Sequence, residues 1–233
     1  MKLSVIIPVY NEERTVRDVI DRVCDVGLEG IDMEIIVSDD GSTDRTGRIV
    51  DEAAIDHPGL ICTFHSPTNR GKGAAVRAGL ELASGDVVLI QDADLELIPH
   101  EYPRLLEPIL GGRTSVVYGS RFLQPVNRIP FVTRWANRVL TTLTNWLFGG
   151  HLTDMETAYK AFRRDAIRGI HLRFSRFEFE PELTAKLLLA GYEITEVPVS
   201  YNPRRAGDGK KIRFSDGVNA VYALLKCRFW DHK

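Results

Sequence analysis

The chain has 233 residues, of which 44% are hydrophobic and 27% are charged, and its formal net charge is −2. This composition is ordinary for a globular protein with a substantial core. The near-neutral charge leaves no global basic surface for nucleic acid, so we expect no nucleic-acid partner. Three scattered cysteines form no CxxC motif, which argues against zinc or redox chemistry. Cys24 and Cys62 lie among apolar residues and are expected to fill the core.

The apolar N-terminus, residues 1–8, is too short for a signal peptide, and no cleavage site follows it. No apolar run approaches the roughly 20 residues that a membrane-spanning helix needs. We therefore expect a cytoplasmic protein, with peripheral attachment to the inner face of a membrane left open.

Strand and helix patterns alternate through the first part of the chain. Apolar, β-rich runs predict strands over residues 3–8, 34–38, 60–65 and 86–90. Helical spacing, with Ser42 or Thr43 as a cap of the second helix, predicts helices over residues 12–26, 42–55 and 74–83. Because helices join apolar strands, this order predicts an α/β fold with a doubly wound, mostly parallel sheet and helices on both faces.

The second part of the chain is less regular. Strands are predicted over residues 115–119, 158–162 and 193–201. Helices are predicted over residues 131–148, 180–190 and 216–229. No repeat or linker interrupts residues 1–233, so we expect a single domain.

Polar clusters follow three of the predicted strands, at residues 10–12, 39–42 and 91–94. In doubly wound sheets, ligands bind outside the carboxyl ends of the strands, and this topology can bring the clusters along one rim. Acidic residues after strands also cap helices, and one cluster alone would mean little. Three clusters favour a ligand site.

Asp92 and Asp94 flank a small residue directly after the apolar strand 86–90. Two carboxylates at this spacing can face one hard cation, and Mg²⁺ or Mn²⁺ prefers oxygen ligands completed by water and substrate phosphate. Asp94 is the expected main ligand, and Glu96 can add an oxygen directly or through water. The DxD pattern is weak alone and gains weight from its position.

The sequence lacks GxGxxG after its first strand and GxxxxGK[ST] anywhere, which argues against NAD and against a P-loop. Asp39 and Asp40 follow the second strand, where an acidic side chain can bond a ribose hydroxyl or the base. The loop 69–73 carries Lys72 between glycines before a helix. Lys72 either meets phosphate or is an exposed lysine at a helix start.

Several motifs together resemble those of family 2 glycosyltransferases with the GT-A fold, and most closely the dolichyl-phosphate mannose synthase group, which glycosylates polyprenyl phosphates. The resemblance covers essentially the whole chain. The motifs that carry it are residues 5–12, 37–44, 69–73, 91–96, 119–122, 153–160 and 179–183.

The resemblance implies roles for individual residues. The residues implied to hold the nucleoside are Pro8, Tyr10, Glu12, Val37 and Asp39. Those implied to meet the metal and diphosphate are Asp92, Ala93, Asp94 and Glu96, although the family more often has glutamine at the position of Glu96. Arg121 and Arg134 would face the acceptor phosphate, and Arg204 and Lys210 would close on the diphosphate or sugar. Residues 1–97 would then bind the nucleotide-sugar, and residues 98–233 the acceptor.

The implied reaction is the inverting, metal-dependent transfer of a sugar from GDP-mannose or a UDP-hexose to dolichyl or undecaprenyl phosphate at the cytoplasmic membrane face. A phosphate acceptor is already anionic and needs no general base. Asp154 and Glu156 are the only base candidates by position, and a structural role such as pairing with an arginine fits Asp154 and Glu156 equally well. Arginine and lysine side chains would fix the phosphates.

A polyprenyl acceptor implies contact with a membrane surface. The helix predicted over residues 131–148 combines tryptophan, leucine and arginine, a pattern typical of an interfacial helix, although a buried helix accounts for it as well. Many relatives carry added membrane-spanning helices, so a membrane-anchoring partner protein is a further expectation.

Three alternatives remain open on the sequence alone. The first is transfer to a hydroxyl of a soluble or glycan acceptor, for which Asp154 would become essential. The second is a non-catalytic nucleotide-binding module, which the intact Asp92 and Asp94 pair opposes. The third is a nucleotidyltransferase, against which the missing glycine-rich N-terminal signature argues. The sequence fixes neither the sugar nor the nucleotide.

Overall fold

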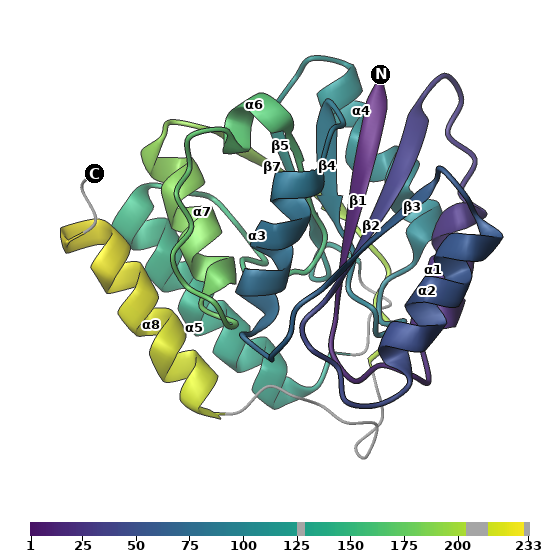
Figure 1. Ribbon diagram of the computed structural model, residues 1–233. Coiled ribbons are helices and arrows are strands. Elements are labelled where there is room, and N and C mark those ends of the chain that lie inside the picture. Colours follow the sequence, from purple (N-terminus) through teal and green to yellow (C-terminus); the bar gives the residue numbers. More distant parts are fainter. Residues whose placement is uncertain (125–128, 204–213, 231–233) are drawn as a thin grey trace.

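The computed structural model describes residues 1–124, 129–203 and 214–230, and a seven-stranded mixed sheet forms its centre (Figure 1). The strands run in the order β3-β2-β1-β4-β6-β5-β7 across the sheet. Their bounds are β1 Lys2–Val9, β2 Asp32–Asp39, β3 Ile61–His65, β4 Val87–Ile90, β5 Val116–Ser120, β6 Lys160–Arg163 and β7 Ile194–Pro198.

Helices cover both faces of this sheet, as Figure 1 shows. Helices α1, α2 and α4 pack on one face, and α3, α6 and α7 pack on the other. Helices α5 and α8 form an outer layer against α7. The helical bounds are α1 Val16–Cys24, α2 Thr46–Asp56, α3 Lys72–Leu82, η1 Pro99–Glu101, α4 Tyr102–Leu110, α5 Phe131–Phe148, α6 Arg164–Ile167, α7 Phe179–Leu189 and α8 Phe214–Phe229.

The central strands are apolar on both sides because both sides are covered. Along β1, Val5 and Ile7 point into the core beneath α1, whereas Ile6 points into the core beneath α3. Every residue of β4 is buried. These patterns confirm the prediction of a doubly wound, mostly parallel α/β sheet.

One strand runs against the others. β6 is antiparallel to both neighbours, β4 and β5, whereas the remaining pairs are parallel. The carboxyl ends of β1, β2, β4, β5 and β7 therefore lie at the same sheet edge as the start of β6, where Lys160 pairs with Ile90. Loops from both parts of the chain converge there.

Some details differ from the sequence predictions. Cys62 is exposed, so its expected place in the core was wrong, and Cys24 is only partly buried against the core. Helix α2 begins at Thr46, and neither Ser42 nor Thr43 caps it. Both residues instead form hydrogen bonds with Asn11 in the loop after β1. The helix α4 was not predicted.

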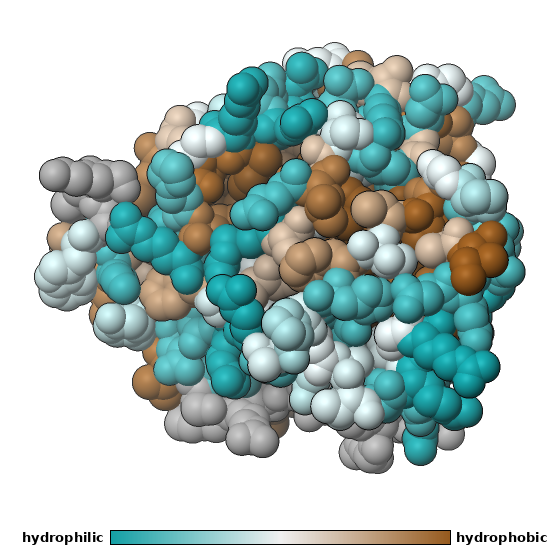
Figure 2. Space-filling view, viewed as in Figure 1, coloured by the Kyte–Doolittle hydropathy of each residue, from teal (hydrophilic) through white to brown (hydrophobic). Residues whose placement is uncertain are grey.

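Within the described ranges, no helix has the length and apolar character needed to cross a bilayer. On the face seen in Figure 2, hydrophobic residues are set among hydrophilic ones over the sheet and its helices.

Candidate active site

A pocket of about 700 Å³ opens at the sheet edge where the carboxyl ends of β1, β2 and β4 meet the start of β6. That volume falls in the range of roughly 300–1,000 Å³ that is typical of small-molecule sites. The residues predicted from the sequence that line it are Pro8, Tyr10, Glu12, Lys72, Asp92, Ala93, Asp94, Glu96 and Arg121. The structure thus brings together most of the side chains that the sequence singled out.

The end of the pocket near β1 and β2 is built from interlocked loops. Asn11 adopts a left-handed conformation, with φ of 49°. Its backbone N–H donates to Ser42 Oγ over 2.9 Å, and its side-chain oxygen accepts from the N–H of Thr43 over 2.8 Å. Asp40 accepts from the N–H groups of Arg70 and Gly71 over 2.8 and 2.6 Å. The walls are therefore held in place by hydrogen bonds.

Two residues predicted to hold the nucleoside lie beneath this end rather than on its surface. The side chain of Val37 is fully buried in the core. Asp39 is buried, and its carboxylate accepts from Ser42 and contacts His65 Nδ1 at 3.1 Å. The next residue, Asp40, lines the pocket.

The loop after β4 presents the two aspartates. Leu95 has a φ of 61°, a left-handed conformation that turns the chain sharply. The N–H of Glu96 donates to Asp94 Oδ1 over 3.1 Å. Behind the loop, the buried Gln91 Oε1 accepts from the hydroxyls of Tyr102 and Tyr159, each over 2.8 Å. These contacts fix the start of the loop that carries Asp92 and Asp94.

Lys72 reaches the same loop from the start of α3. Its ammonium lies 2.8 Å from Asp92 Oδ1 and 2.8 Å from Glu180 Oε1, and only 14% of its side chain is exposed. Burial alone would lower the pKa of Lys72, but Asp92 and Glu180 together raise it well above its usual value. The alternative of an exposed lysine at this position was wrong.

The glycines beside Lys72 allow the start of α3 to pack closely against the segment that precedes α7. A side chain at Gly71, whose φ is 105°, would clash with the backbone of Ser175, and one at Gly73 would lie 2.6 Å from the carbonyl oxygen of Phe174. The glycines let the N-terminus of α3 approach that segment closely.

Glu180 continues the ion-pair network into the core. It lies in the first turn of α7, 4% exposed, and is bound by both Lys72 and the fully buried Lys160. Burial raises the pKa of Glu180, but the two lysines outweigh this effect and hold the pKa below its usual value. A buried carboxylate is tolerable here because it has two cationic partners.

The donor set suits a hard cation held partly by substrate. Within the described ranges, no group of three or more His, Cys, Asp or Glu side chains is placed to hold a metal ion. Asp92 and Asp94 nevertheless offer carboxylate oxygens to the pocket. Mg²⁺ commonly binds through one or two carboxylates, with water and phosphate completing its shell. The residues present fit such an ion.

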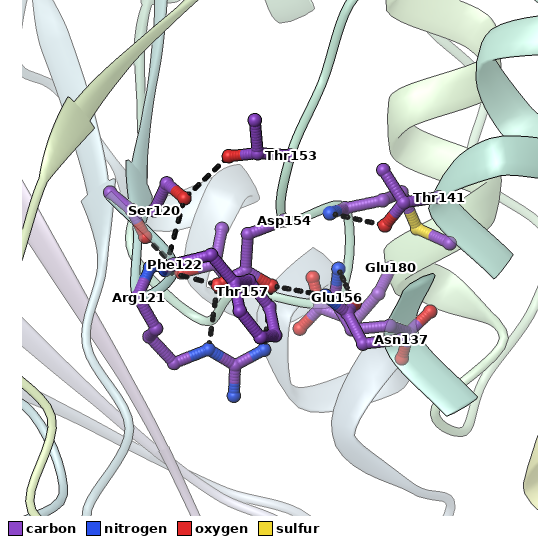
Figure 3. A network of polar contacts seen from close by, with 12 residues as sticks. Ser120, Arg121, Phe122, Asn137, Thr141, Thr153, Asp154, Glu156, Thr157 and Glu180 are labelled. Carbon is purple, nitrogen blue, oxygen red and sulfur yellow. Dashed lines mark hydrogen bonds and ion pairs between the residues drawn. The ribbon is translucent and has the colours of Figure 1, made fainter. Parts of the chain in front are cut away.

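On the far wall, Arg121 is held by a buried carboxylate (Figure 3). Its Nε and Nη2 donate to the two oxygens of Asp154, each over 2.7 Å, and Asp154 is fully buried. Its guanidinium lies 5.2 Å from the ring centroid of Tyr201. The pairing with an arginine foreseen for Asp154 is confirmed.

Three other predicted residues are Arg134, Arg204 and Lys210. Arg134 is exposed in the first turn of α5 and does not line the pocket, although its neighbour Thr133 does. Arg204 and Lys210 lie outside the described residues.

Sequence reasoning assigned no individual role to several lining residues: Asn69, Arg176, Phe177, Glu180, Tyr201, Asp216 and Asn219. A signal existed for Glu180, because the motif 179–183 places acidic residues in the first turn of a helix. The others come from loops and helix starts with no distinctive spacing.

The fold and site define the class of protein: a glycosyltransferase of the GT-A type. The model of the family described as glycosyl transferase family 2 matches residues 4–170, so the chain belongs to that family.

Curated relatives are similar over nearly the whole chain. Polyprenol monophosphomannose synthase of Mycolicibacterium smegmatis is 31% identical over 97% of this chain and 85% of its own length. Dolichol-phosphate mannosyltransferase of Pyrococcus furiosus is 30% identical over 97% of this chain, which spans only 64% of that protein. Undecaprenyl-phosphate 4-deoxy-4-formamido-L-arabinose transferase of Pectobacterium carotovorum is 31% identical, with coverage of 97% and 67%.

Solved structures share the fold. Glucosyl-3-phosphoglycerate synthase from Mycobacterium tuberculosis, in complex with phosphoglyceric acid, has a TM-score of 0.70 at 24% identity, covering 97% of this chain and 80% of that one. Its complex with Mg²⁺ and uridine diphosphate has a TM-score of 0.71 at 23% identity, with coverage of 97% and 79%. These similarities confirm the GT-A prediction.

Proposed function

We propose that this enzyme transfers a sugar from a nucleotide-sugar to a polyprenyl phosphate, with inversion and with a divalent metal ion. The observation that carries the proposal is that one pocket is lined both by the carboxylates of Asp92 and Asp94 and by the cationic Arg121. The names of the relatives, which describe transfer involving polyprenyl phosphates, support the same acceptor.

The donor would lie along the sheet edge. Its nucleoside would sit at the ends of β1 and β2, against Pro8, Tyr10 and Glu12, with Asp40 below. Its diphosphate would lie at the end of β4, where Asp92 and Asp94 would hold Mg²⁺ or Mn²⁺. When bound, the metal would neutralise charge on the departing nucleoside diphosphate. Lys72 would fix Asp92 for that task.

The acceptor phosphate would be placed by Arg121. Asp154 holds the Arg121 guanidinium bidentately, so the fork is fixed before a substrate arrives. A phosphate oxygen placed in line with the anomeric carbon attacks as the nucleoside diphosphate leaves from the opposite face, which inverts the configuration. The phosphate is an anion at neutral pH, so no side chain has to remove a proton.

Helix α5 supports contact with a lipid surface. Its buried side includes Leu140, Thr144 and Leu147. The side chains of Phe131, Trp135 and Trp146 are 80%, 62% and 79% exposed and fall on the opposite side of the helix. The buried-helix alternative therefore covers one side only, and we propose that the exposed side rests at the membrane interface.

A donor screen tests this proposal. The protein is incubated with a short polyprenyl phosphate, Mn²⁺ and each of a panel of UDP- and GDP-sugars, and products are identified by mass spectrometry. We expect one donor to yield a glycosyl phosphopolyprenol. Nucleotide-sugar binding with no transfer from any donor would contradict the proposal and favour a non-catalytic module.

A hydroxyl acceptor is the second candidate, and one observation favours it. Burial, and then the nearby Glu180, raise the pKa of Glu156 to about 7, a value suited to a general base. Asp154 suits that role poorly, because Arg121 and Asn137 already occupy its oxygens. Activity toward a sugar or alcohol hydroxyl that exceeds activity toward a polyprenyl phosphate would establish this candidate.

A further inference from the structure

The carboxylate of Glu156 stands apart from the other acidic groups in the pocket. Its Oε1 is buried and accepts no hydrogen bond within the described part of the chain. The residue nevertheless lines the pocket. Buried polar atoms normally have partners, and an unpaired one costs free energy. A ligand that donates a hydrogen bond would remove this cost.

The segment that carries Glu156 is held firmly. The N–H of Glu156 donates to Asn137 Oδ1 over 3.2 Å, and the side chain of Asn137 also donates to Asp154 (Figure 3). On the other side, the hydroxyl of Thr157 donates to the carbonyl oxygen of Gly119 over 2.6 Å. Glu156 is therefore fixed toward the pocket rather than placed there by a mobile loop.

The neighbouring cations are engaged elsewhere. Lys160 binds Glu180 and the carbonyl oxygen of Thr157, and Arg121 binds Asp154. Glu180 and Asp154 add negative charge around Glu156, and the positive charges of Lys160 and Arg121 offset only part of it. An anionic ligand at Glu156 would be repelled, whereas a neutral hydroxyl would be bound. Glu156 therefore differs in its preferred ligand from Arg121, whose cationic guanidinium suits a phosphate.

The order of strands places Glu156 beyond the diphosphate. The nucleoside end lies at β2 and β1, and Asp92 and Asp94 follow β4. The next strand is β6, and Glu156 lies just before its first residue, Lys160. In a nucleotide-sugar, the sugar is attached to the far end of the diphosphate. A donor bound along this edge would therefore bring its sugar to Glu156.

We propose that Glu156 binds a hydroxyl of the donor's sugar, accepting its hydrogen bond at Oε1, and so helps to select the sugar. This inference rests on the proposed function. It assigns to Glu156 a contact with the transferred group and no proton transfer.

Calorimetry on the full chain with Mg²⁺ tests the assignment. The probes are UDP and GDP, compared with UDP-glucose, UDP-galactose and GDP-mannose, and the tightest-binding nucleotide-sugar is used for the variants. Glu156→Ala is expected to bind the nucleoside diphosphate within about twofold of wild type and the nucleotide-sugar at least about tenfold more weakly, because a charged hydrogen bond is lost. Glu156→Gln keeps an acceptor oxygen and is expected to lose less.

Glu182→Gln is the matched control. Glu182 is fully buried and bound by Lys186, Arg173 and Phe174, but it does not line the pocket. Its substitution should lower the melting temperature and leave the ratio of the two affinities unchanged. A melting curve for each variant separates loss of folding from loss of binding.

Two results would overturn the assignment. Equal losses for the nucleoside diphosphate and the nucleotide-sugar would make Glu156 a support for the whole pocket. Unchanged affinities with a collapsed turnover number would make it a general base. If wild type binds UDP or GDP but no nucleotide-sugar is ever consumed, the proposed function fails as well, which distinguishes that failure from the loss of this contact alone.

Discussion

Lys72 lines the pocket and lies between the carboxylates of Asp92 and Glu180, 2.8 Å from each. Its place shows how much a single residue depends on tertiary context. The sequence offered a cation between two glycines and left open whether it met phosphate or solvent. Its main partner besides Asp92 comes from α7, and nothing in local sequence indicates that α7 would reach α3. Long-range ion pairs of this kind follow from the fold.

Lys72→Met should lower both the stability of the protein and its transfer rate. Removing the buried cation leaves Asp92 and Glu180 facing each other, with Lys160 as the remaining partner of Glu180. We expect a loss of about 3 kcal/mol in the free energy of unfolding and at least about a hundredfold loss in transfer rate. Denaturant titration and a transfer assay measure the two effects.

Lys186→Met is the control for this change. Lys186 pairs with Glu182 and is 13% exposed, almost as buried as Lys72, but it lies outside the pocket. It should lower stability with little change in the transfer rate of the folded protein. An equal fall in rate for both variants would contradict the role given to Lys72.

Glu156 should make stability depend on pH in a specific direction. Its pKa is raised from an ordinary 4.5 to about 7, by burial first and then by Glu180, so the folded state holds a proton that the unfolded state has lost between these values. Its stabilising contribution is therefore complete below about pH 4.5 and is lost as the pH rises through 7.

Glu156→Gln removes this dependence. The unfolding free energy of wild type relative to the variant should fall by about 2 kcal/mol between pH 5 and pH 8. Urea titrations across that range measure the difference. Curves that stay parallel would show that Glu156 titrates at its ordinary value in the folded protein.

At the scale of elements, the sequence predicted most of the framework and little of the site's far wall. The strands of the parallel half and α5 were predicted within a few residues, because alternation and helical spacing are strong signals. The helix α4 was missed because Pro103 and Pro108 interrupt its pattern, although one stands in its first turn. The insertion of β6 between β4 and β5 was not foreseeable, since strand order depends on packing across the whole chain.

The two sides of α5 should respond differently to substitution. Trp135→Ser together with Trp146→Ser removes exposed aromatic side chains, so we expect several-fold weaker binding to anionic lipid vesicles and almost no change in melting temperature. Vesicle sedimentation measures the binding. Leu140→Ala, on the buried side, is the converse control and should cost about 2–5 kcal/mol of stability with vesicle binding retained. Unchanged binding by the double variant would contradict the interfacial role.

At the scale of the molecule, one sheet edge collects groups from both parts of the chain. Tyr10, Asp40 and Asp92 come from the parallel part, and Arg121 and Glu156 come from the part that contains the antiparallel strand. This arrangement is consistent with a donor-binding half at residues 1–97 and an acceptor-binding half at residues 98–233, which stays a prediction. The position of Glu156 suggests that the second half also contacts the donor's sugar.

The most direct test compares two acceptors that differ only in their terminal phosphate group. Wild-type enzyme is given its donor, Mn²⁺ and either a short polyprenyl phosphate or the matching polyprenol, and product is quantified by mass spectrometry. We predict transfer to the phosphate and at least about a hundredfold slower transfer to the alcohol, because Arg121 is proposed to bind the acceptor phosphate and the proposed mechanism assigns no general base. Comparable rates with both acceptors would contradict the account.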